Sequence, residues 1–456
     1  MSNNWKFNFA SATLMLALPV MIFLKHQAYP LATPEVALIF AGILALGAAL
    51  GLAMTVGRSL GTVAIGAGLI TLVLDVQTDW WTSYPLRAGL LMVVIYGISW
   101  FSRRYLTRAL AVVSGAMFLS TVVLPAGQPV VREGTPQGHN PDLPFILHIV
   151  LDEQIGIEGI PGEFDKDGAI AGKMRDFYLG NSFQLYGRAY SRYYQTKMSV
   201  PSLLGPSPAE AGNAWFDRLR EQGYKIHVIQ SDFLRYGGDT SLTYTAEAIQ
   251  HISRTAVSSK EKAALVIGEF FKLSGYLEPP LGRRYVHLSH LSSWEMIPEL
   301  RAQVEEARPG QAVFAHILLP HSPYAFSDDC TMETVAAKWL ESLPQSAAPR
   351  RNTEASRALR YPLYLKQVLC VQEQLNDIFQ ALKDRGLWEN SIVIIHGDHG
   401  PRLNIGSDLN RLNERDHQDA YSTLFAVKRP GIPGGYFRER VSIDRLFQRM
   451  FLICLT

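Results

Sequence analysis

Acidic and imidazole side chains follow three separate apolar runs that have the length of β-strands. They are Asp152 with Glu153, His321, and Asp398 with His399. Carboxylate and imidazole ligands without thiolate suit Zn²⁺ or Mn²⁺, and also Mg²⁺ or Ca²⁺ where oxygen ligands dominate. Each motif alone is weak, because a histidine after a strand or an Asp-His-Gly turn is more often an ordinary loop. Their joint occurrence at strand ends predicts a divalent-metal site.

A hydroxyl nucleophile is predicted within the segment YYQTKMSVPSLLG, residues 193–205. Thr196 and Ser199 precede Pro201 and an apolar run, a pattern typical of the start of a helix. A hydroxyl there faces unpaired backbone N–H groups, which stabilise negative charge. Beside a metal ion its pKa falls, and it can attack phosphorus or sulfur. The alternative is that the hydroxyl merely caps the helix.

The elements that must position these side chains alternate along the chain. Apolar runs of strand length lie at 143–151, 224–230, 312–319, 391–396 and 424–428. Helical stretches lie at 215–221, 259–275, 294–306 and about 353–385. Apolar strands separated by helices predict an α/β fold with a mostly parallel sheet covered on both faces. Sites in such sheets lie at the C-terminal ends of the strands, where the acidic and imidazole side chains occur.

The first 125 residues differ in composition from the rest. Charged residues are only 18% of the chain, whose net charge is +2, and residues 1–125 carry seven Lys and Arg against three acids. Five apolar stretches lie at 7–24, 34–56, 60–74, 85–101 and 106–124. Most approach the ~20 residues needed to cross a bilayer. We therefore predict a five-helix transmembrane domain, rather than a signal peptide or a buried helical domain of a soluble protein.

Basic residues predict the orientation of these helices. With the N-terminus in the cytoplasm, Lys6, Arg58 and the cluster within 103–108 lie on the cytoplasmic side. Five crossings then place the remaining chain outside. The Pro/Gly-rich residues 126–142 are predicted to be a linker, and residues 143–456 an extracytoplasmic catalytic domain.

Overall charge and cysteine content exclude other classes of protein. The near-neutral net charge argues against a nucleic-acid-binding protein. Three cysteines exclude a disulfide-dense scaffold or a Cys-rich metal module. Cys330 and Cys370 flank the helical insertion that follows His321, and they can pair in an oxidising compartment. Cys454 would be left over.

Four motifs in this order resemble the alkaline phosphatase superfamily in its sulfatase-like branch. They are IVLDE (149–153), TKMSVPSLLG (196–205), LLPHSPY (318–324) and HGDHG (396–400). With the apolar helices that precede them, they are most similar to bacterial inner-membrane phosphoethanolamine transferases and lipoteichoic acid synthases. The resemblance implies a sulfatase-like α/β/α sandwich behind the membrane helices.

The resemblance also implies roles for individual residues. Glu153 would be a metal ligand, and Asp152 a second ligand or a structural acid. Thr196 would be the nucleophile and contact the metal, whose site Asp398 and His399 complete. Substrate contacts are implied as well, for His321, His417 and Arg402.

Two departures from the family patterns keep alternatives open. Residues 199–203 fit the sulfatase pattern C/S-x-P-S-R, but Leu203 stands where arginine is expected. Ser199 is therefore a competing nucleophile. The transferases usually have glycine before their glutamate, whereas this chain has Asp152.

The function implied is a metal-dependent phosphotransferase of the bacterial inner membrane, with Zn²⁺ favoured over Mn²⁺, Mg²⁺ or Ca²⁺. It would move a phospholipid-derived head group, of the phosphoethanolamine or phosphoglycerol type, through a phospho-threonine onto an envelope glycan or lipid. Its partners would be a phospholipid donor, that acceptor and the membrane. The alternatives are a sulfatase or phosphodiesterase-type hydrolase, and a non-catalytic lipid-binding regulator.

Overall fold

A computed structural model describes residues 4–78, 85–123, 140–205, 213–231, 242–246, 252–253, 257–274, 289–333, 354–403 and 412–453. The chain forms two compact units. The first comprises residues 1–128 and 252–286, and the second comprises residues 129–251 and 287–456. Of the predicted linker, 126–142, only 140–142 are among the described residues, and Cys454 also lies outside them.

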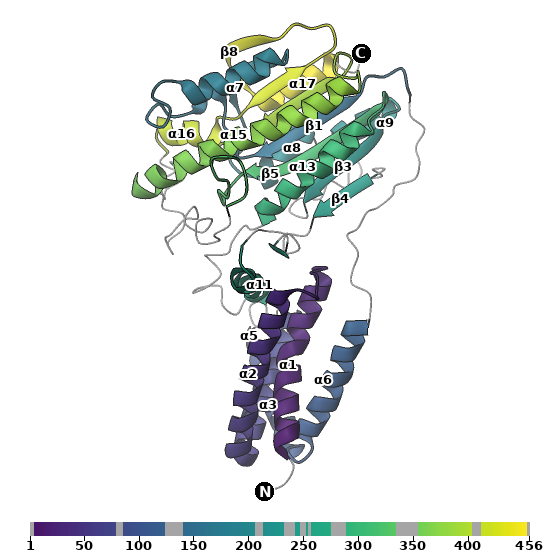
Figure 1. Ribbon diagram of the computed structural model, residues 1–456, viewed down its shortest axis with the longest axis vertical. Helices are drawn as coiled ribbons and strands as arrows, with labels where there is room; N and C mark the ends of the chain where they lie inside the picture. Colours follow the sequence, from purple (N-terminus) through teal and green to yellow (C-terminus); the bar gives the residue numbers. More distant parts are fainter. Residues whose placement is uncertain are drawn as a thin grey trace. The chain divides into compact units, whose positions relative to one another are not determined.

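The first unit contains a helix at each of the five predicted apolar stretches (Figure 1). They are α1 (Asn4–His26), α2 (Pro34–Val56), α3 (Arg58–Thr78), α5 (Pro85–Phe101) and α6 (Leu106–Val123). Among the described residues, 5–26, 34–56 and 106–123 are long and apolar enough to cross a membrane. The apolar segments of α3 and α5 are shorter, at 58–74 and 89–101. Three candidate membrane spans are thus present, and the predicted count of five crossings stays a prediction.

Close packing in this unit depends on small residues. Gly47 and Gly51 lie one turn apart on α2 and face α1, which also packs against α6. A Cβ atom at Gly51 would lie only 2.8 Å from the Cα atom of Phe9. Glycine is therefore needed for the two backbones to approach, as in many helix pairs within membranes.

Helix α11 (Ser259–Ser274) belongs to the first unit, whereas the alternation of strands and helices groups it with the helices that cover the sheet. It packs against α2 and α3, and the ring of Phe270 lies edge-on to Phe23 of α1 at 5.4 Å. Leu265 and Val266 are buried with Phe270. The apolar side of α11 is thus used against other helices, and helical periodicity alone does not reveal which surface it will cover.

The second unit is built on one eight-stranded sheet in the order β4-β3-β5-β1-β6-β7-β2-β8. The strands are β1 (Ile146–Asp152), β2 (Gln184–Tyr190), β3 (Lys225–Ser231), β4 (Leu242–Ala246), β5 (Gln311–Pro320), β6 (Ile392–Gly397), β7 (Phe425–Lys428) and β8 (Gly435–Ser442). Only β7 is antiparallel to its neighbours, so β2 and β8 run in the same direction as β1. The predicted mostly parallel sheet is confirmed, although β2, β4 and β8 do not stand out as apolar runs.

Helices cover both faces of the sheet. The described helices of this unit are α7 (Ala169–Gly180), α8 (Thr196–Leu204), α9 (Ala214–Glu221), α13 (Ser289–Glu305), α15 (Glu354–Asp384), α16 (Glu414–Tyr421) and α17 (Ile443–Ile453). Along β1, Leu147, Ile149 and Leu151 enter the core beneath α7, α13 and α15. Ile146 and Val150 enter the opposite core, beneath α8, α9 and α17. Because successive side chains of a strand point to opposite faces, a continuous apolar run is required here. This is the predicted α/β/α sandwich.

Candidate active site

Three strand ends come together at one edge of the sheet. Leu151 of β1 pairs with Gly397 of β6, and Asp152 pairs with Pro320 of β5. The residues that follow these strands therefore lie side by side, as the sequence predicts. Helix α8 brings Thr196 to the same edge, since its hydroxyl contacts Asp152.

Asp152, Asp398 and His399 form a buried group, called here the metal-ligand group. Each offers one ligand atom, and these atoms all lie within 4.8 Å of one another. All three residues are at most 1% exposed. His399 Nδ1 lies 2.8 Å from the carbonyl oxygen of Gly400. Donation from Nδ1 to this carbonyl leaves the lone pair of Nε2 directed at the two carboxylates, as a metal ligand requires.

The hydrogen bonds of Asp398 fit a bound cation. Its Oδ1 atom accepts backbone N–H bonds from Glu153 at 3.0 Å and from His399 at 2.8 Å. Its buried Oδ2 atom has no hydrogen-bond donor among the described residues. A buried carboxylate oxygen without a donor is costly unless a cation takes that place. Two carboxylates, an imidazole and a neighbouring hydroxyl are a suitable donor set for a divalent metal ion.

Electrostatics agree with this interpretation. Burial raises the pKa of Asp152 well above its usual value, and the neighbouring Asp398 and Glu153 carboxylates raise it further. Arg402, which pairs with Glu153, lowers the pKa of Asp152 without cancelling this rise. A divalent cation would offset the remaining repulsion between the Asp152 and Asp398 carboxylates.

Thr196 and Ser199 lie one turn apart on α8 but make different contacts. The Thr196 hydroxyl lies 3.2 Å from Asp152 Oδ1 and 3.1 Å from His399 Nε2. The Ser199 hydroxyl donates to the backbone carbonyl of Asp398 at 2.6 Å. Thr196 is thus next to the metal-ligand group, whereas Ser199 holds the backbone of the β6–Asp398 turn.

Glu153, His321 and Arg402 form a second cluster. Arg402 donates to the Glu153 carboxylate from Nε at 3.0 Å and again from its terminal nitrogen. His321 Nε2 lies 3.3 Å from the same carboxylate oxygen. The side chain of Glu153 therefore faces Arg402 and His321, while Asp152 faces the metal-ligand group. The role of Glu153 as a metal ligand stays a prediction, and Asp152 is the acid of this pair that lies with Asp398 and His399.

Backbone conformation explains how adjacent acids serve two clusters. Glu153 and Arg402 have φ angles of +63° and +58°. Such left-handed conformations are uncommon outside glycine, and they concentrate at functional sites. Because of this conformation at Glu153, the chain leaves the direction of β1, and the Glu153 side chain faces Arg402 and His321.

His417 is not brought into either cluster. It lies on α16 with an exposed side chain, and its ring stacks on Tyr421 at 5.7 Å. It lines a hollow of about 900 Å³ that also contains Tyr190 and Arg440. Its predicted role in binding substrate stays a prediction.

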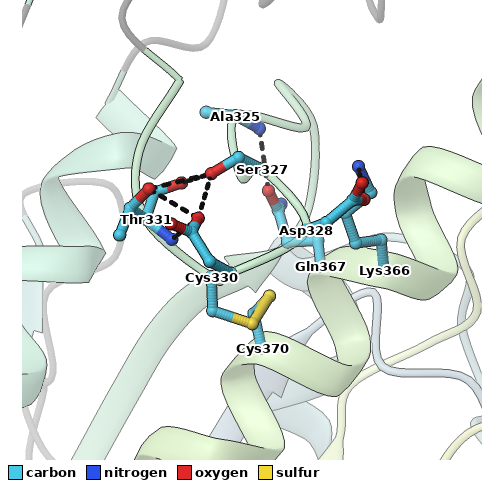
Figure 2. Close-up of a disulfide and its surroundings, with 9 residues drawn as sticks. Ala325, Ser327, Asp328, Cys330, Thr331, Lys366, Gln367 and Cys370 are labelled. Carbon is cyan, nitrogen blue, oxygen red and sulfur yellow. Dashed lines mark hydrogen bonds and ion pairs between the residues drawn. A yellow bond between two sulfur atoms is a disulfide. The ribbon is translucent and has the colours of Figure 1, made fainter.

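Two residues of α15 that sequence analysis missed hold the strand ends in place. Tyr364 donates its hydroxyl to the carbonyl of Glu153 at 2.6 Å and accepts the N–H of Ile155 at 2.9 Å. Gln367, which is fully buried, donates to the carbonyls of Pro320 and His321, each at 3.0 Å. Its amide oxygen accepts the N–H of Ala325 at 3.0 Å (Figure 2). Tyr364 and Gln367 are three positions apart, so they lie on the same side of α15. This spacing of two polar residues in a buried helix is the signal by which the sequence could have indicated them.

Replacing Gln367 by glutamate is expected to destabilise the protein in a pH-dependent way. The change keeps the shape but places a carboxylate against carbonyl oxygens, so the free energy of unfolding should fall by about 2–4 kcal/mol at pH 8. Burial raises the pKa of such a carboxyl, and its protonated form donates again, so the loss should shrink at pH 5. Denaturant unfolding at both pH values tests this. Gln372→Glu, whose half-buried side chain donates only one long bond, at 3.4 Å to the carbonyl of Lys173, should lose much less, and equal losses in both variants would contradict the assignment.

A disulfide joins the segment after His321 to α15. Cys330 and Cys370 are bonded, 40 residues apart in sequence (Figure 2). Cys370 lies one turn beyond Gln367, so the crosslink and the amide bonds hold the same segment against the same helix. The pairing predicted from the two cysteines is the one present in the structure.

Cys370→Ser is expected to lower the free energy of unfolding by about 2–4 kcal/mol, because a closed loop of this length restricts the unfolded chain. The thermal midpoint of wild-type and variant protein, with and without a phosphine reductant, measures the effect. The reductant should bring the wild type down to the variant and leave the variant unchanged. Equal midpoints without reductant would mean that the crosslink contributes no stability.

Comparisons with known proteins agree with this fold. The profile described as Sulfatase matches residues 184–440, which include Thr196, His321, Asp398 and His399. No protein with curated annotation matches the chain.

Solved structures are similar at low sequence identity. A phosphonate monoester hydrolase of Agrobacterium radiobacter has 14% identity and a TM-score of 0.41, over 68% of this chain and 73% of that one. An alkaline phosphatase superfamily protein from Vibrio parahaemolyticus has 11% identity and a TM-score of 0.40, over 72% and 69%. The C-terminal periplasmic domain of EcEptC from Escherichia coli, in complex with Zn, has 10% identity and a TM-score of 0.39, over 70% and 83%.

The profile match covers more than half of the chain and includes Asp398 and His399 of the metal-ligand group, whereas Asp152 precedes it. This chain therefore belongs to the sulfatase family.

Proposed function

We propose that this chain is a membrane-anchored, metal-dependent phosphotransferase. It moves a phospholipid-derived head group, of the phosphoethanolamine or phosphoglycerol type, onto a hydroxyl group of an envelope glycan or lipid. The observation that carries the proposal is the position of the Thr196 hydroxyl, 3.2 Å from Asp152 and 3.1 Å from His399. A hydroxyl beside a metal-ligand group is suited to attack phosphorus.

Two displacements at phosphorus account for the transfer. In the first, the Thr196 oxygen bonds to phosphorus, the bond from phosphorus to the diacylglycerol oxygen breaks, and that oxygen takes up the proton that Thr196 loses. In the second, the acceptor oxygen bonds to phosphorus, the bond to Thr196 breaks, and Thr196 takes up the acceptor's proton. A divalent ion, Zn²⁺ in our proposal, would lower the pKa of the hydroxyl and offset charge on the phosphoryl oxygens.

The second cluster supports the same chemistry. Arg402 is a fixed cation beside the metal-ligand group, suited to a phosphoryl oxygen. His321, whose Nε2 atom faces Glu153 at 3.3 Å, carries an imidazole that is suited to act as a general acid or base.

The first unit supports a membrane location. Its candidate spans would hold the site near lipid head groups. We propose the bacterial inner membrane, with the catalytic unit on the extracytoplasmic side, because basic residues favour the cytoplasmic ends of the helices. The Cys330–Cys370 disulfide is also typical of an oxidising compartment.

A hydrolase is the second candidate, because the matching profile is that of sulfatases. Water would replace the acceptor in the second displacement. Ser199 would be the nucleophile of a sulfatase, yet its hydroxyl proton is directed at the carbonyl of Asp398. A lipid-binding regulator without catalysis would keep the clusters but form no covalent adduct.

Mass spectrometry of the Thr196 peptide tests the proposal. The full chain, loaded with Zn²⁺, is incubated with vesicles of phosphatidylethanolamine and phosphatidylglycerol. We expect one head-group phosphate on Thr196, with release of diacylglycerol in equal amount. An adduct on Ser199, or no adduct in metal-loaded protein, would overturn the mechanism. Rapid loss of the adduct in water alone would favour a hydrolase.

A further inference from the structure

The hollow that contains His417, called here the Tyr190 pocket, opens at the same edge of the sheet as the active site. It has a volume of about 900 Å³. The lining residues that matter for the argument are Glu158, Arg188, Tyr190, Glu414, His417, Tyr421 and Arg440. Because β2 and β8 run parallel to β1, their final residues Tyr190 and Ser442 lie at the edge that carries Asp152.

The pocket is near the nucleophile but separate from the metal-ligand group. Two strand spacings separate β6 from β2, which is roughly 10 Å. The ring of Tyr194, two residues before Thr196, packs edge-on against Tyr421 at 6.1 Å. Ser191 donates its backbone N–H to the carbonyl of Tyr421 at 2.8 Å. A ligand in the pocket would thus lie against the segment that leads into α8.

The walls combine flat aromatic faces with polar groups. The Arg440 guanidinium lies 4.9 Å from the ring centre of Tyr190. The rings of His417 and Tyr421 on α16 stack at 5.7 Å and also line the pocket. Arg440 and His417 are exposed, so their polar ends are open to a ligand.

Balanced charge limits the kind of ligand. Arg188 lies 3.8 Å from Glu158, and Arg440 and Glu414 add one charge of each sign. Two carboxylates would repel a purely anionic ligand, and the predominantly polar lining does not suit an acyl chain. Donors and acceptors placed together beside aromatic rings match a ligand whose hydroxyl groups both donate and accept.

We propose that the Tyr190 pocket binds a sugar residue of the acceptor, and so directs a neighbouring hydroxyl toward Thr196. The inference rests on the proposed transferase function. It specifies that the acceptor is a glycan or the sugar head group of a glycolipid. His417 then contributes to acceptor binding rather than to chemistry at phosphorus.

Saccharide binding to the full chain in lipid nanodiscs tests the inference without any turnover. Saturation-transfer NMR is recorded with cellotetraose and chitotetraose as probes, and binding of inorganic phosphate is followed by broadening of its ³¹P signal. We expect at least one tetrasaccharide to bind, and the double variant His417→Ala/Arg440→Ala to weaken its Kd by about tenfold or more. Both side chains are exposed, so the variant should fold. Arg449→Ala, on an exposed residue of α17 outside the pocket, should bind as the wild type does.

Three outcomes would overturn the inference. Neither tetrasaccharide binds the wild type, or the double variant binds as well as the wild type, or phosphate alone binds and the double variant abolishes that binding. Thr196 labelling by donor vesicles is measured on the same wild-type preparation. Labelling without saccharide binding contradicts the pocket alone, whereas saccharide binding without labelling contradicts the transferase function.

Discussion

Thr196→Ala is expected to abolish formation of the covalent adduct and to lower acceptor-dependent turnover by at least about 10³-fold, because no other group replaces a lost nucleophile efficiently. Zn²⁺ should still bind, since Asp152, Asp398 and His399 remain. Adduct mass, diacylglycerol release and zinc content, measured on the same preparation, separate loss of chemistry from loss of the site.

Ser199→Ala is the matched control for this prediction. It removes a hydroxyl from the same helix, one turn away, that donates to the carbonyl of Asp398. We expect a stability loss of about 1–2 kcal/mol, because a buried carbonyl loses its donor, while Thr196 remains labelled. If Ser199→Ala abolished labelling and Thr196→Ala did not, the assignment of the nucleophile would be reversed.

The sequence predicts the α/β/α fold because of a single physical requirement. Strands such as β1 and β6 are buried on both faces, so they are apolar at most positions and stand out from the helices. The buried polar exceptions within them include His148 and His396, whose Nε2 atoms lie 2.8 Å apart. β2 and β8 keep exposed positions, as in the pattern of β8 around Arg438 and Arg440, and their composition does not reveal them. The position of α11 depends on which apolar surfaces meet, which periodicity does not encode.

The site was predictable where chemistry follows a strand end. Asp152, His321, Asp398 and His399 are side by side because parallel strands finish at one edge. The sequence does not reveal that Asp152 lies in the metal-ligand group while Glu153 pairs with Arg402. This difference depends on the left-handed backbone conformation at Glu153.

Asp152→Asn is expected to change stability in opposite directions with and without metal. In metal-free protein the variant removes a buried charge that Asp398 and Glu153 repel, so the unfolding midpoint should rise. The folded protein holds the Asp152 proton more tightly than the unfolded chain, since the pKa of Asp152 is raised. Wild-type stability is therefore present at low pH and lost as pH rises through that pKa, and the variant should not show this loss.

With Zn²⁺ the order of the two proteins should reverse. A ligand at about 1,000 times its Kd stabilises the wild type by about 4 kcal/mol, and the variant, which lacks one carboxylate ligand, should lose most of that gain. Unfolding midpoints after chelation and after Zn²⁺ addition, with bound zinc measured directly, test both halves of the prediction.

Glu153→Gln separates the two acids of the IVLDE motif. Its carboxylate pairs with Arg402, whose side chain is largely buried, so the variant removes the closest negative charge from this guanidinium and should lose about 2–4 kcal/mol even without metal. Zn²⁺ should still stabilise it, because the metal-ligand group is intact. If Glu153→Gln instead removed the metal response and Asp152→Asn kept it, Glu153 would be the first metal carboxylate, as the family resemblance implies. The two variants alter neighbouring residues by the same chemical change, so opposite outcomes can arise only from where the backbone turn at Glu153 directs each side chain.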